Sequence, residues 1–459
     1  MQDILIPFRG SLPAGVQTEL RAQRNTTRAV SLLDGRLVGN QRSEGSGVSA
    51  RVTKNGVCGF ASMAELTAEA AGKVLAAAGE NAAFFDRHVP KNKPARPVIA
   101  PCDIQPGTAW NDAAQKQYID FLQALDAYLA KKDHLLSRRL IVRADSREKC
   151  LLTSDGASAH TAIPRCYIYA VLDADTKDAG PVELFHAFGG FGGFDAQFTT
   201  PEALYPELDA LYEKLMQKRE GVYAEAGLKT CILGGDLGGM LAHEAVGHTV
   251  EADLVLGGSV AGPNLGKPVA SELVSMTDFA HTAFGETAPL PVYCDDEGVP
   301  AEDAKLIENG VLTGYMHNRE SAAHFGVKPM GNARAYSFSD EPLIRMRNTA
   351  VHPGKDRLED IIASVDDGYY LFETNNGQAD STGEFMFGVT MGYEIKKGKL
   401  GRAILDTTIT GVAFEMLKTV DMVSDHMTWS SAGTCGKKQP MPVGMGGPEL
   451  RCKLMIGGR

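Results

Sequence analysis

Residues 231–253 read CILGGDLGGMLAHEAVGHTVEAD. Two histidines lie in this stretch, His243 and His248, and Glu244 directly follows the first of them. Imidazole nitrogens bind transition metals and a neighbouring carboxylate can take a proton from water, so these side chains are candidates for metal-dependent chemistry. The glycine-rich run before them, residues 234–239, lacks the Gly-Lys-Ser/Thr ending of a phosphate-binding loop. We interpret this run as a place where backbones pack closely.

The spacing of the two histidines, H-E-x-x-x-H, is unusual for a single helix. Side chains four residues apart differ by about 40° around an α-helix, whereas side chains five apart differ by about 140°. A regular helix therefore cannot present His243 and His248 to one ion. Gly247, directly before His248, suits either a π-bulge or the end of the helix. The alternative is that both histidines are unrelated polar residues on a buried helix, with Glu244 capping or pairing elsewhere.

A catalytic zinc site needs a third protein ligand from elsewhere in the chain. The residues with suitable chemistry are Glu251, Asp253, His281, His426, Cys435 and Cys452. Cys435 stands out because residues 433–437 form a polar, glycine-containing segment, and its lysine, Lys437, favours the thiolate. An ordinary loop cysteine is the alternative interpretation of this position.

The first half of the chain predicts antiparallel strands mixed with long helices. Turn signals at Asp34-Gly35 and Asn55-Gly56 separate runs that are typical of strands. Apolar periodicity, composition and end signals predict helices over residues 67–81, 112–132 and 201–225. We place a domain boundary after the third helix, which defines an N-terminal mixed strand and helix domain over residues 1–225.

The second half, residues 226–459, predicts a β-rich metal-binding domain. Hairpin signals recur in it, at Asn309-Gly310 and Lys397-Gly398. The acidic segment Asp295-Asp296-Glu297-Gly298 could be imagined as a divalent-metal site, but strand residues precede it and glycine closes it, which favours a solvated hairpin turn. The predicted fold class is α+β with two domains.

Bulk composition limits the class of protein. The chain has 459 residues, enough for more than one domain, and no apolar run approaches the roughly 20 residues of a membrane-spanning helix. Its start, residues 1–9, lacks the basic and apolar pattern of an export signal. We therefore expect a soluble, cytoplasmic protein without a membrane partner. The net charge of -11 argues against nucleic-acid binding through phosphate contacts.

The segment His243 to Asp253 resembles the signature of the TldD/PmbA family of metallopeptidases, on the TldD side, where the H-E-x-x-x-H motif is intact. Similar blocks follow in family order at residues 269–273, 295–298, 306–316, 347–355, 377–380 and 435–446. The resemblance covers the chain from about Cys231 onward and is diffuse before it.

This resemblance implies that His243, His248 and Cys435 bind Zn²⁺, and that Glu244 is the catalytic base that activates a zinc-bound water. It implies a zinc-dependent peptidase that hydrolyses unfolded or small peptides. It also implies a homodimer, or a heterodimer with a PmbA-like paralogue, around an enclosed cavity. The older label "modulator of DNA gyrase" belongs to the same family.

Two other functions are consistent with the same residues. The chain could be a non-catalytic regulatory or assembly subunit, as the paralogues without the metal motif are, although retention of both histidines and Glu244 argues against this. It could also be a zinc hydrolase of non-peptide amides, because the same groups would activate water toward any carbonyl.

Overall fold

The computed structural model describes residues 1–89, 94–106, 113–176 and 180–457. Its N-terminal half contains one seven-stranded sheet in the order β3-β2-β1-β5-β6-β4, with β7 pairing to β6. The strands are β1 (Gln17–Leu33), β2 (Arg36–Lys54), β3 (Val57–Met63), β4 (Asp103–Ile104), β5 (Leu135–Thr153), β6 (Ser158–Ala174) and β7 (Val182–Phe191). Long antiparallel strands with helices packed beside them confirm the predicted α+β class.

Local turn chemistry explains the order of the first three strands. Asp34-Gly35 joins β1 to β2, and Asn55-Gly56 joins β2 to β3. All four residues have positive φ, between 49° and 82°. A two-residue hairpin of type I′ needs positive φ at both central positions, which asparagine, aspartate and glycine tolerate best. The hairpins predicted at both positions are confirmed.

Helices cover one face of this sheet, since the even-numbered apolar residues of β1 and β5 pack against them in two clusters. The N-terminal half contains α1 (Gln2–Leu5), α2 (Ala68–His88), α3 (Gln115–Leu129), α4 (Phe194–Gln197) and α5 (Tyr205–Arg219). The Thr67 side chain accepts a hydrogen bond from the Ala70 backbone N–H and so caps α2, which extends past the predicted end. The third helix ends at Arg219, before its predicted end at residue 225. Asp112, the first residue of the second predicted helix, lies outside the described residues.

The C-terminal half is built on two larger sheets. The first has the order β17-β8-β26-β20-β18-β19, with β21 pairing to β26, and it closes on itself because β17 also pairs with β18. Its strands are β8 (Gly227–Leu233), β17 (Asp367–Ala379), β18 (Glu384–Lys396), β19 (Lys399–Ala403), β20 (Thr407–Val412), β21 (Met422–Val423) and β26 (Leu450–Ile456). Lys397-Gly398, with positive φ at both residues, joins β18 to β19 as predicted.

The second sheet has the order β13-β12-β9-β16-β25-β22. Its strands are β9 (Met276–Phe279), β12 (Ala304–Glu308), β13 (Val311–Leu312), β16 (Asn348–Val351), β22 (Thr428–Ser430) and β25 (Gly444–Gly447). The predicted hairpin at Asn309-Gly310 is confirmed between β12 and β13. One large apolar core lies between elements of both sheets and includes Leu241, Ala245 and Cys435.

Shorter elements complete the C-terminal half. The strand pairs are β10 (Thr282–Ala283) with β11 (Glu286–Thr287), β14 (Ala333–Arg334) with β15 (Leu343–Ile344), and β23 (Thr434–Cys435) with β24 (Met441–Pro442). The helices are α6 (Gly235–Met240), α7 (Ala252–Leu256), α8 (Arg319–Phe325), α9 (Leu358–Ala363) and α10 (Ala413–Leu417). Within the described residues, no helix combines the length and apolar character needed to cross a membrane.

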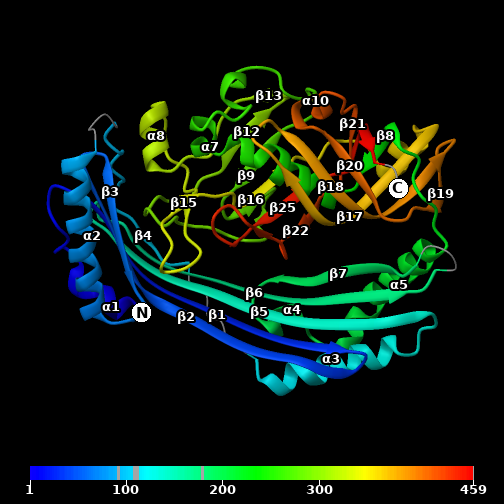
Figure 1. Ribbon diagram of the computed structural model, residues 1–459, viewed down its shortest axis with the longest axis horizontal. Coiled ribbons are helices and arrows are strands. Elements are labelled where there is room, and N and C mark those ends of the chain that lie inside the picture. The colour runs from blue at the N-terminus through cyan, green and yellow to red at the C-terminus, as the bar shows by residue number, and fades with distance from the viewer. Residues whose placement is uncertain (90–93, 107–112, 177–179, 458–459) are drawn as a thin grey trace.

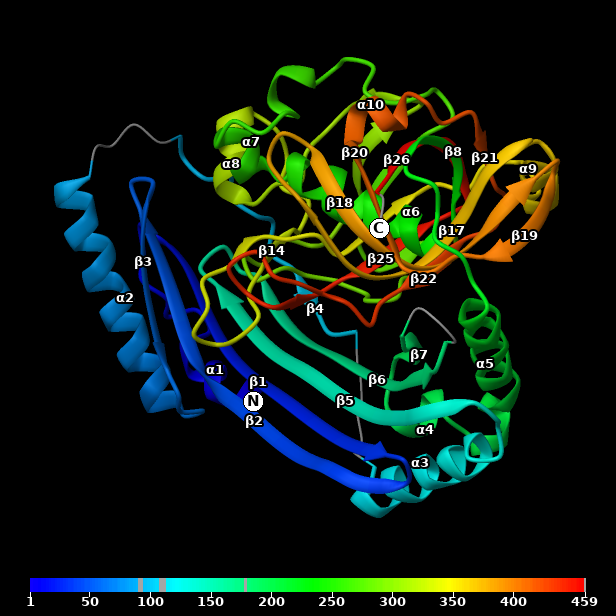
Figure 2. The same cartoon turned by 45° about the vertical axis from the view of Figure 1, so that its right-hand side comes forward.

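The C-terminal half lies over the concave face of the curved N-terminal sheet (Figures 1 and 2). Hydrogen bonds join the two halves: Arg21 on β1 donates to the carbonyl of Ser337, and Arg165 on β6 donates to that of Ser431. The assignment of residues 1–225 and 226–459 to separate domains stays a prediction.

The acidic segment at residues 295–298 corrects one expectation. A turn is present, with Gly298 at φ 80°, but its three acidic residues are at most 5% exposed rather than solvated. Asp296 pairs with Lys149 at 2.6 Å, and Glu297 pairs with Arg51 at 2.5 Å. Because Lys149 and Arg51 belong to the N-terminal sheet, the segment connects the two halves through buried ion pairs. The sequence pattern identified the turn but carried no information about what would cover it.

Candidate metal centre

The helix that carries the two histidines changes its winding at this point. Helix α6 leads into a π-helical segment, Leu241–Gly247, which is followed by a single 3₁₀ turn, His248–Val250. A π turn accommodates one more residue than an α turn, so it brings positions five apart onto one side. The rings of His243 and His248 accordingly lie 5.2 Å apart between centroids. The predicted local alteration of the helix is confirmed as a π-helical segment.

Close packing explains why glycine stands at residue 247. Its backbone, at φ -53°, is ordinary helix that any residue can adopt. A Cβ atom at this position would lie only 2.2 Å from Met346 Sδ. A Cβ on Gly239 in α6 would similarly lie 2.9 Å from the backbone nitrogen of Gly446 in β25. The glycines here permit close approach, as interpreted for the run at residues 234–239, rather than unusual backbone angles.

A third donor reaches the two histidines from a distant part of the chain. One ligand atom from each of His243, His248 and Cys435 lies within 4.8 Å of the others. The Cys435 Sγ is 3.4 Å from His248 Nε2, although 187 residues separate them in sequence. Strand β23 carries the cysteine, and its pairing with β24 fixes it beside the π-helical segment. The structure therefore brings together all three metal ligands predicted from the sequence.

The other candidates for the third ligand have different partners. Asp253 pairs with Lys437 at 2.7 Å, and His281 stacks on the ring of Tyr293. Cys452 lies in the β8–β26 ladder opposite Cys231. Among the described residues, the one cluster of at least three histidine, cysteine or acidic side chains with metal-binding spacing is the His243, His248 and Cys435 group, which also leaves His426 outside.

Two residues position the metal ligands, a role that the sequence analysis did not assign to them. Glu251 is fully buried and its Oε2 accepts a hydrogen bond at 2.7 Å from Nδ1 of His248. Lys437 Nζ lies 3.3 Å from Glu251 Oε1 and compensates its charge. The spacing of three residues between His248 and Glu251 is a signal for contact on a helical turn. This spacing alone did not show whether Glu251 binds the metal itself or orients the histidine that does.

Glu244 borders the cluster without belonging to it. Its carboxylate oxygens lie 3.8 Å from His243 Nε2 and 3.7 Å from His248 Nε2. The Glu244 side chain is 21% exposed, whereas that of His243 is 1% exposed. The predicted base thus lies on the side of the centre that reaches solvent.

The donor set fits a metal ion. Both ring nitrogens of His243 are buried without a hydrogen-bond partner among the described residues, which is costly unless another group satisfies them. Burial raises the pKa of the Cys435 thiol, but the neighbouring imidazoles of His243 and His248 outweigh burial and lower it to about 3. The cluster therefore favours the thiolate, which is the form of cysteine that binds metals.

The environment of His248 is also strongly polar. Burial lowers the pKa of this imidazole, but its interactions with Cys435 and Glu251 outweigh burial and raise the pKa to about 10. A buried thiolate and a buried carboxylate thus flank one imidazole, so negative charge accumulates where a cation would be held.

Two histidines and a thiolate around one point, with a carboxylate beside them in an α+β fold, are typical of metal-dependent hydrolases. Residues 227–458 match the family model described as the PmbA/TldA metallopeptidase C-terminal domain, and residues 18–82 match PmbA/TldA metallopeptidase domain 1. The chain belongs to the TldD/PmbA family of metallopeptidases.

Named relatives agree with this assignment. A metalloprotease from Methanothermobacter thermautotrophicus is 30% identical over 96% of this chain and 95% of its own length. A zinc metalloprotease TldD homolog from Saccharolobus solfataricus is 34% identical over 54% of this chain and 56% of its own length.

Solved structures share the fold at low sequence identity. TldE from Thermococcus kodakarensis superposes with a TM-score of 0.75 at 18% identity, over 100% of both chains. A Thermotoga maritima protein that carries the name of a DNA gyrase modulator has a TM-score of 0.78 at 20% identity, over 99% of both chains.

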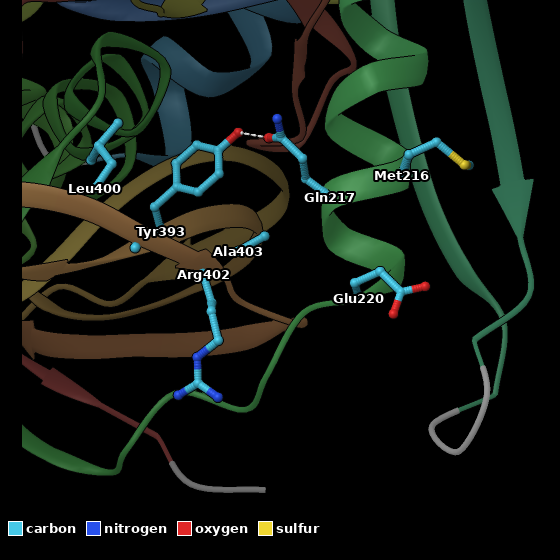
Figure 3. Close-up of a pocket in the computed structure, with 8 residues that line it drawn as sticks. Met216, Gln217, Glu220, Tyr393, Leu400, Arg402 and Ala403 are labelled. Carbon is cyan, nitrogen blue, oxygen red and sulfur yellow. Dashed lines mark hydrogen bonds between the residues drawn. The ribbon is translucent and has the colours of Figure 1, made fainter.

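A cavity of about 680 Å³ lies apart from this centre, between the end of α5 and strands β18 and β19 (Figure 3). The described residues that line it are Met216, Gln217, Glu220, Tyr393, Leu400, Gly401, Arg402 and Ala403. The Tyr393 hydroxyl donates to Gln217 Oε1, and Arg402 pairs with Glu394 at 2.9 Å. Since its lining has neither histidine nor cysteine, we do not assign metal chemistry to it.

Proposed function

We propose that this chain is a zinc-dependent peptidase that hydrolyses unfolded or small peptides. In this proposal His243, His248 and Cys435 hold the ion, and Glu244 is the catalytic base. The observation that carries it is the convergence of three donors within 4.8 Å, two of them buried and His248 half-buried, with a partly exposed glutamate at their edge.

Zinc fits these donors better than the other common divalent ions. Thiolate and imidazole are ligands of zinc and related transition metals, whereas magnesium and calcium prefer oxygen. Three protein ligands leave one position open, as in catalytic zinc sites. When bound, zinc supplies Lewis-acid chemistry toward a peptide carbonyl and toward water.

The side chains around the proposed ion have two roles, proton transfer and orientation of the ligands. Glu244 takes the proton from the attacking water and passes it to the departing amine, a role that its exposure to solvent permits. Glu251 accepts the Nδ1–H of His248, which leaves Nε2 free to face the ion. Lys437 holds Glu251 in turn, and it lies two residues from Cys435 on the same segment.

The proposed setting is the cytoplasm, where a second copy of the chain or a PmbA-like paralogue would complete a dimer. All eight cysteines are free, which is typical of a reducing compartment. Co-purification with a PmbA-like paralogue, or a homodimer on its own, tests this pairing.

Elemental analysis of protein purified without chelator tests the site. We expect about one zinc per chain in the wild type and loss of zinc in His248→Ala and Cys435→Ser. The Glu244→Gln variant should retain zinc while its hydrolysis of unfolded peptides is abolished, because the carboxylate is needed for proton transfer and not for binding the ion.

Different results would favour the other functions. Wild-type protein that lacks zinc and refuses added zinc would favour a regulatory subunit. Wild-type turnover in Glu244→Gln would reject the mechanism. Hydrolysis of small amides with no cleavage of unfolded peptides would favour an amide hydrolase.

A further inference from the structure

A second polar pocket lies where the N-terminal sheet meets the segment that carries Cys435. Its volume is about 300 Å³, which is the lower end of the range for small-ligand sites. The side chains that matter for its chemistry are Arg143, Asp145, Arg147, Arg165, Tyr336 and Thr434. We call it the arginine pocket.

Strand geometry places the charged groups together. Arg143, Asp145 and Arg147 alternate along β5, so their side chains share one face of the sheet. Arg165 on β6 stands directly opposite Asp145 in the ladder. This face is the one that meets the C-terminal half, because Arg165 and Tyr167 both donate to the carbonyl of Ser431.

Three guanidinium groups share one carboxylate in this pocket. Arg165 binds Asp145 through two hydrogen bonds, of 3.1 and 2.8 Å, and Arg147 contacts the same carboxylate at 3.3 Å. Arg143 approaches it only to 4.0 Å. The two buried arginines, Arg147 and Arg165, against one carboxylate leave an excess of one buried positive charge, and a buried charge without compensation is costly.

Burial makes a further anion more favourable, because water cannot stabilise the charges of the buried arginines. The side chains of Arg147 and Arg165 are 8% and 5% exposed, whereas that of Arg143 is 49% exposed and lies at the mouth. Burial and the nearby Arg165 together lower the pKa of Arg147 to about 10. An incoming anion would offset the repulsion from Arg165 and favour the charged form of Arg147.

The pocket and the metal centre are neighbours across one strand. Thr434 is exposed and lines the pocket, while the next residue, Cys435, is buried among the metal donors. Successive side chains of a strand point to opposite faces. A peptide held in the arginine pocket would therefore contact the segment that positions the thiolate.

We propose that the arginine pocket binds a peptide carboxylate, with Arg147 and Arg143 as its ligands. Guanidinium groups bind carboxylates in a planar, two-point geometry that lysine cannot reproduce. The ring of Tyr336, with the Arg147 guanidinium 5.9 Å from its centroid, offers an apolar wall for the residue that carries the carboxylate. This inference rests on the proposed peptidase function, since it assigns peptides as the ligand.

Fluorescence anisotropy with the full-length Glu244→Gln protein tests the proposal without turnover. One probe is an unstructured peptide with a free C-terminal carboxylate and no acidic side chain, labelled at its N-terminus, and its partner is the C-terminal amide. A second pair of amidated peptides carries one glutamate or one glutamine. We expect a carboxylate, in one pair or the other, to tighten binding about tenfold or more. The pair that responds identifies the source of the carboxylate.

The arginine variants locate the effect. In Arg143→Gln, at the exposed mouth, and in Arg147→Met, the advantage of the carboxylate should disappear, whereas Arg139→Gln, exposed on the same strand and outside the pocket, should keep it. Equal binding of both members of each pair, absence of peptide binding, or a carboxylate advantage that survives in both pocket variants would overturn the proposal. Carboxylate-dependent binding combined with a wild type that cleaves no peptide would instead retain the pocket and reject the peptidase function.

Discussion

At the scale of single residues, the orientation of His248 depends on a residue that does not contact the proposed ion. Glu251 is buried, holds Nδ1 of His248 at 2.7 Å, and is itself compensated by Lys437. Metal-binding histidines commonly donate their second ring N–H to a carboxylate, which fixes the ring and raises its basicity. Part of the zinc affinity should therefore reside in Glu251.

The Glu251→Gln substitution measures this contribution. We expect zinc affinity to fall about tenfold or more, because the amide cannot supply the negative charge next to the imidazole. Competition with a chromogenic chelator reports the affinity directly. Asp253→Asn is the matched control, since Asp253 also pairs with Lys437 but does not contact His248. Equal affinity in Glu251→Gln and wild type would contradict the positioning role.

At the scale of elements, the π-helical segment brings His243 and His248, which are five residues apart, to the same side of the helix. It is held by packing rather than by special backbone angles: Gly247 has an ordinary helical φ and lies against Met346, which comes from the segment after β15. The wide turn and the missing Cβ at residue 247 are thus two parts of one arrangement.

Gly247→Ala should destabilise the protein, because its new methyl group would overlap Met346 Sδ. We expect a loss of about 1–3 kcal/mol in the free energy of unfolding, measured by urea denaturation. Combining it with Met346→Ala should cost less than the sum of the two single changes, because the shorter side chain removes the closer overlap and leaves only the contact with the Ala242 carbonyl oxygen.

A control glycine separates packing from helix propensity. Gly79 lies in α2, and a Cβ there would meet nothing within 4 Å. Gly79→Ala should therefore leave stability unchanged or raise it by up to about 1 kcal/mol. If the free-energy losses of Gly247→Ala and Met346→Ala are strictly additive, the contact with Met346 is not the cause of the destabilisation.

At the scale of the whole molecule, buried ion pairs connect the N-terminal sheet to the C-terminal half. Glu297 pairs with Arg51 and Arg96 at 2.5 and 2.8 Å, and Glu19 pairs with the same two arginines. Arg319 at the start of α8 also approaches Glu19. Removing one member of such a network leaves the others buried without compensation.

This junction predicts sensitivity to acid. Burial raises the pKa of Glu297, but Arg96 and Arg51 outweigh burial and lower it to about 2, from an ordinary value of 4.5. Between these values the unfolded chain binds more protons at this residue than the folded chain does. Stability that is present above pH 4.5 is therefore lost as the pH falls toward 2, by about 3 kcal/mol from this residue.

Urea denaturation across this pH window tests the sign and the source. Glu297→Gln should be less stable at neutral pH, and its stability should fall less steeply in acid than that of the wild type. Glu359→Gln, at an exposed pair with Arg357, should keep the wild-type slope. Parallel slopes for the wild type and Glu297→Gln would place the acid sensitivity elsewhere.

Local features were predictable because they depend on a few neighbouring residues. Asn309-Gly310 and Asp34-Gly35 tolerate positive φ, so the sequence predicted their hairpins without knowledge of the sheets they join. The need for a distorted helix followed from the spacing of His243 and His248 alone. Burial was not predictable in this way: Asp296 and Glu297 looked like solvated turn residues, and the halves of the molecule that enclose them come from distant parts of the chain.

The sequence by itself determined the family and the hairpins. It also predicted the two histidines with Glu244 and, through the family resemblance, Cys435 as the third ligand. Only the tertiary structure brought Cys435 rather than Asp253 or Cys452 to the histidines, across 187 residues. The physical reason is that a metal site is a matter of distance between side-chain atoms. Periodicity along a chain fixes such distances within one turn of helix, whereas contacts between separate strands and helices depend on how the whole core packs.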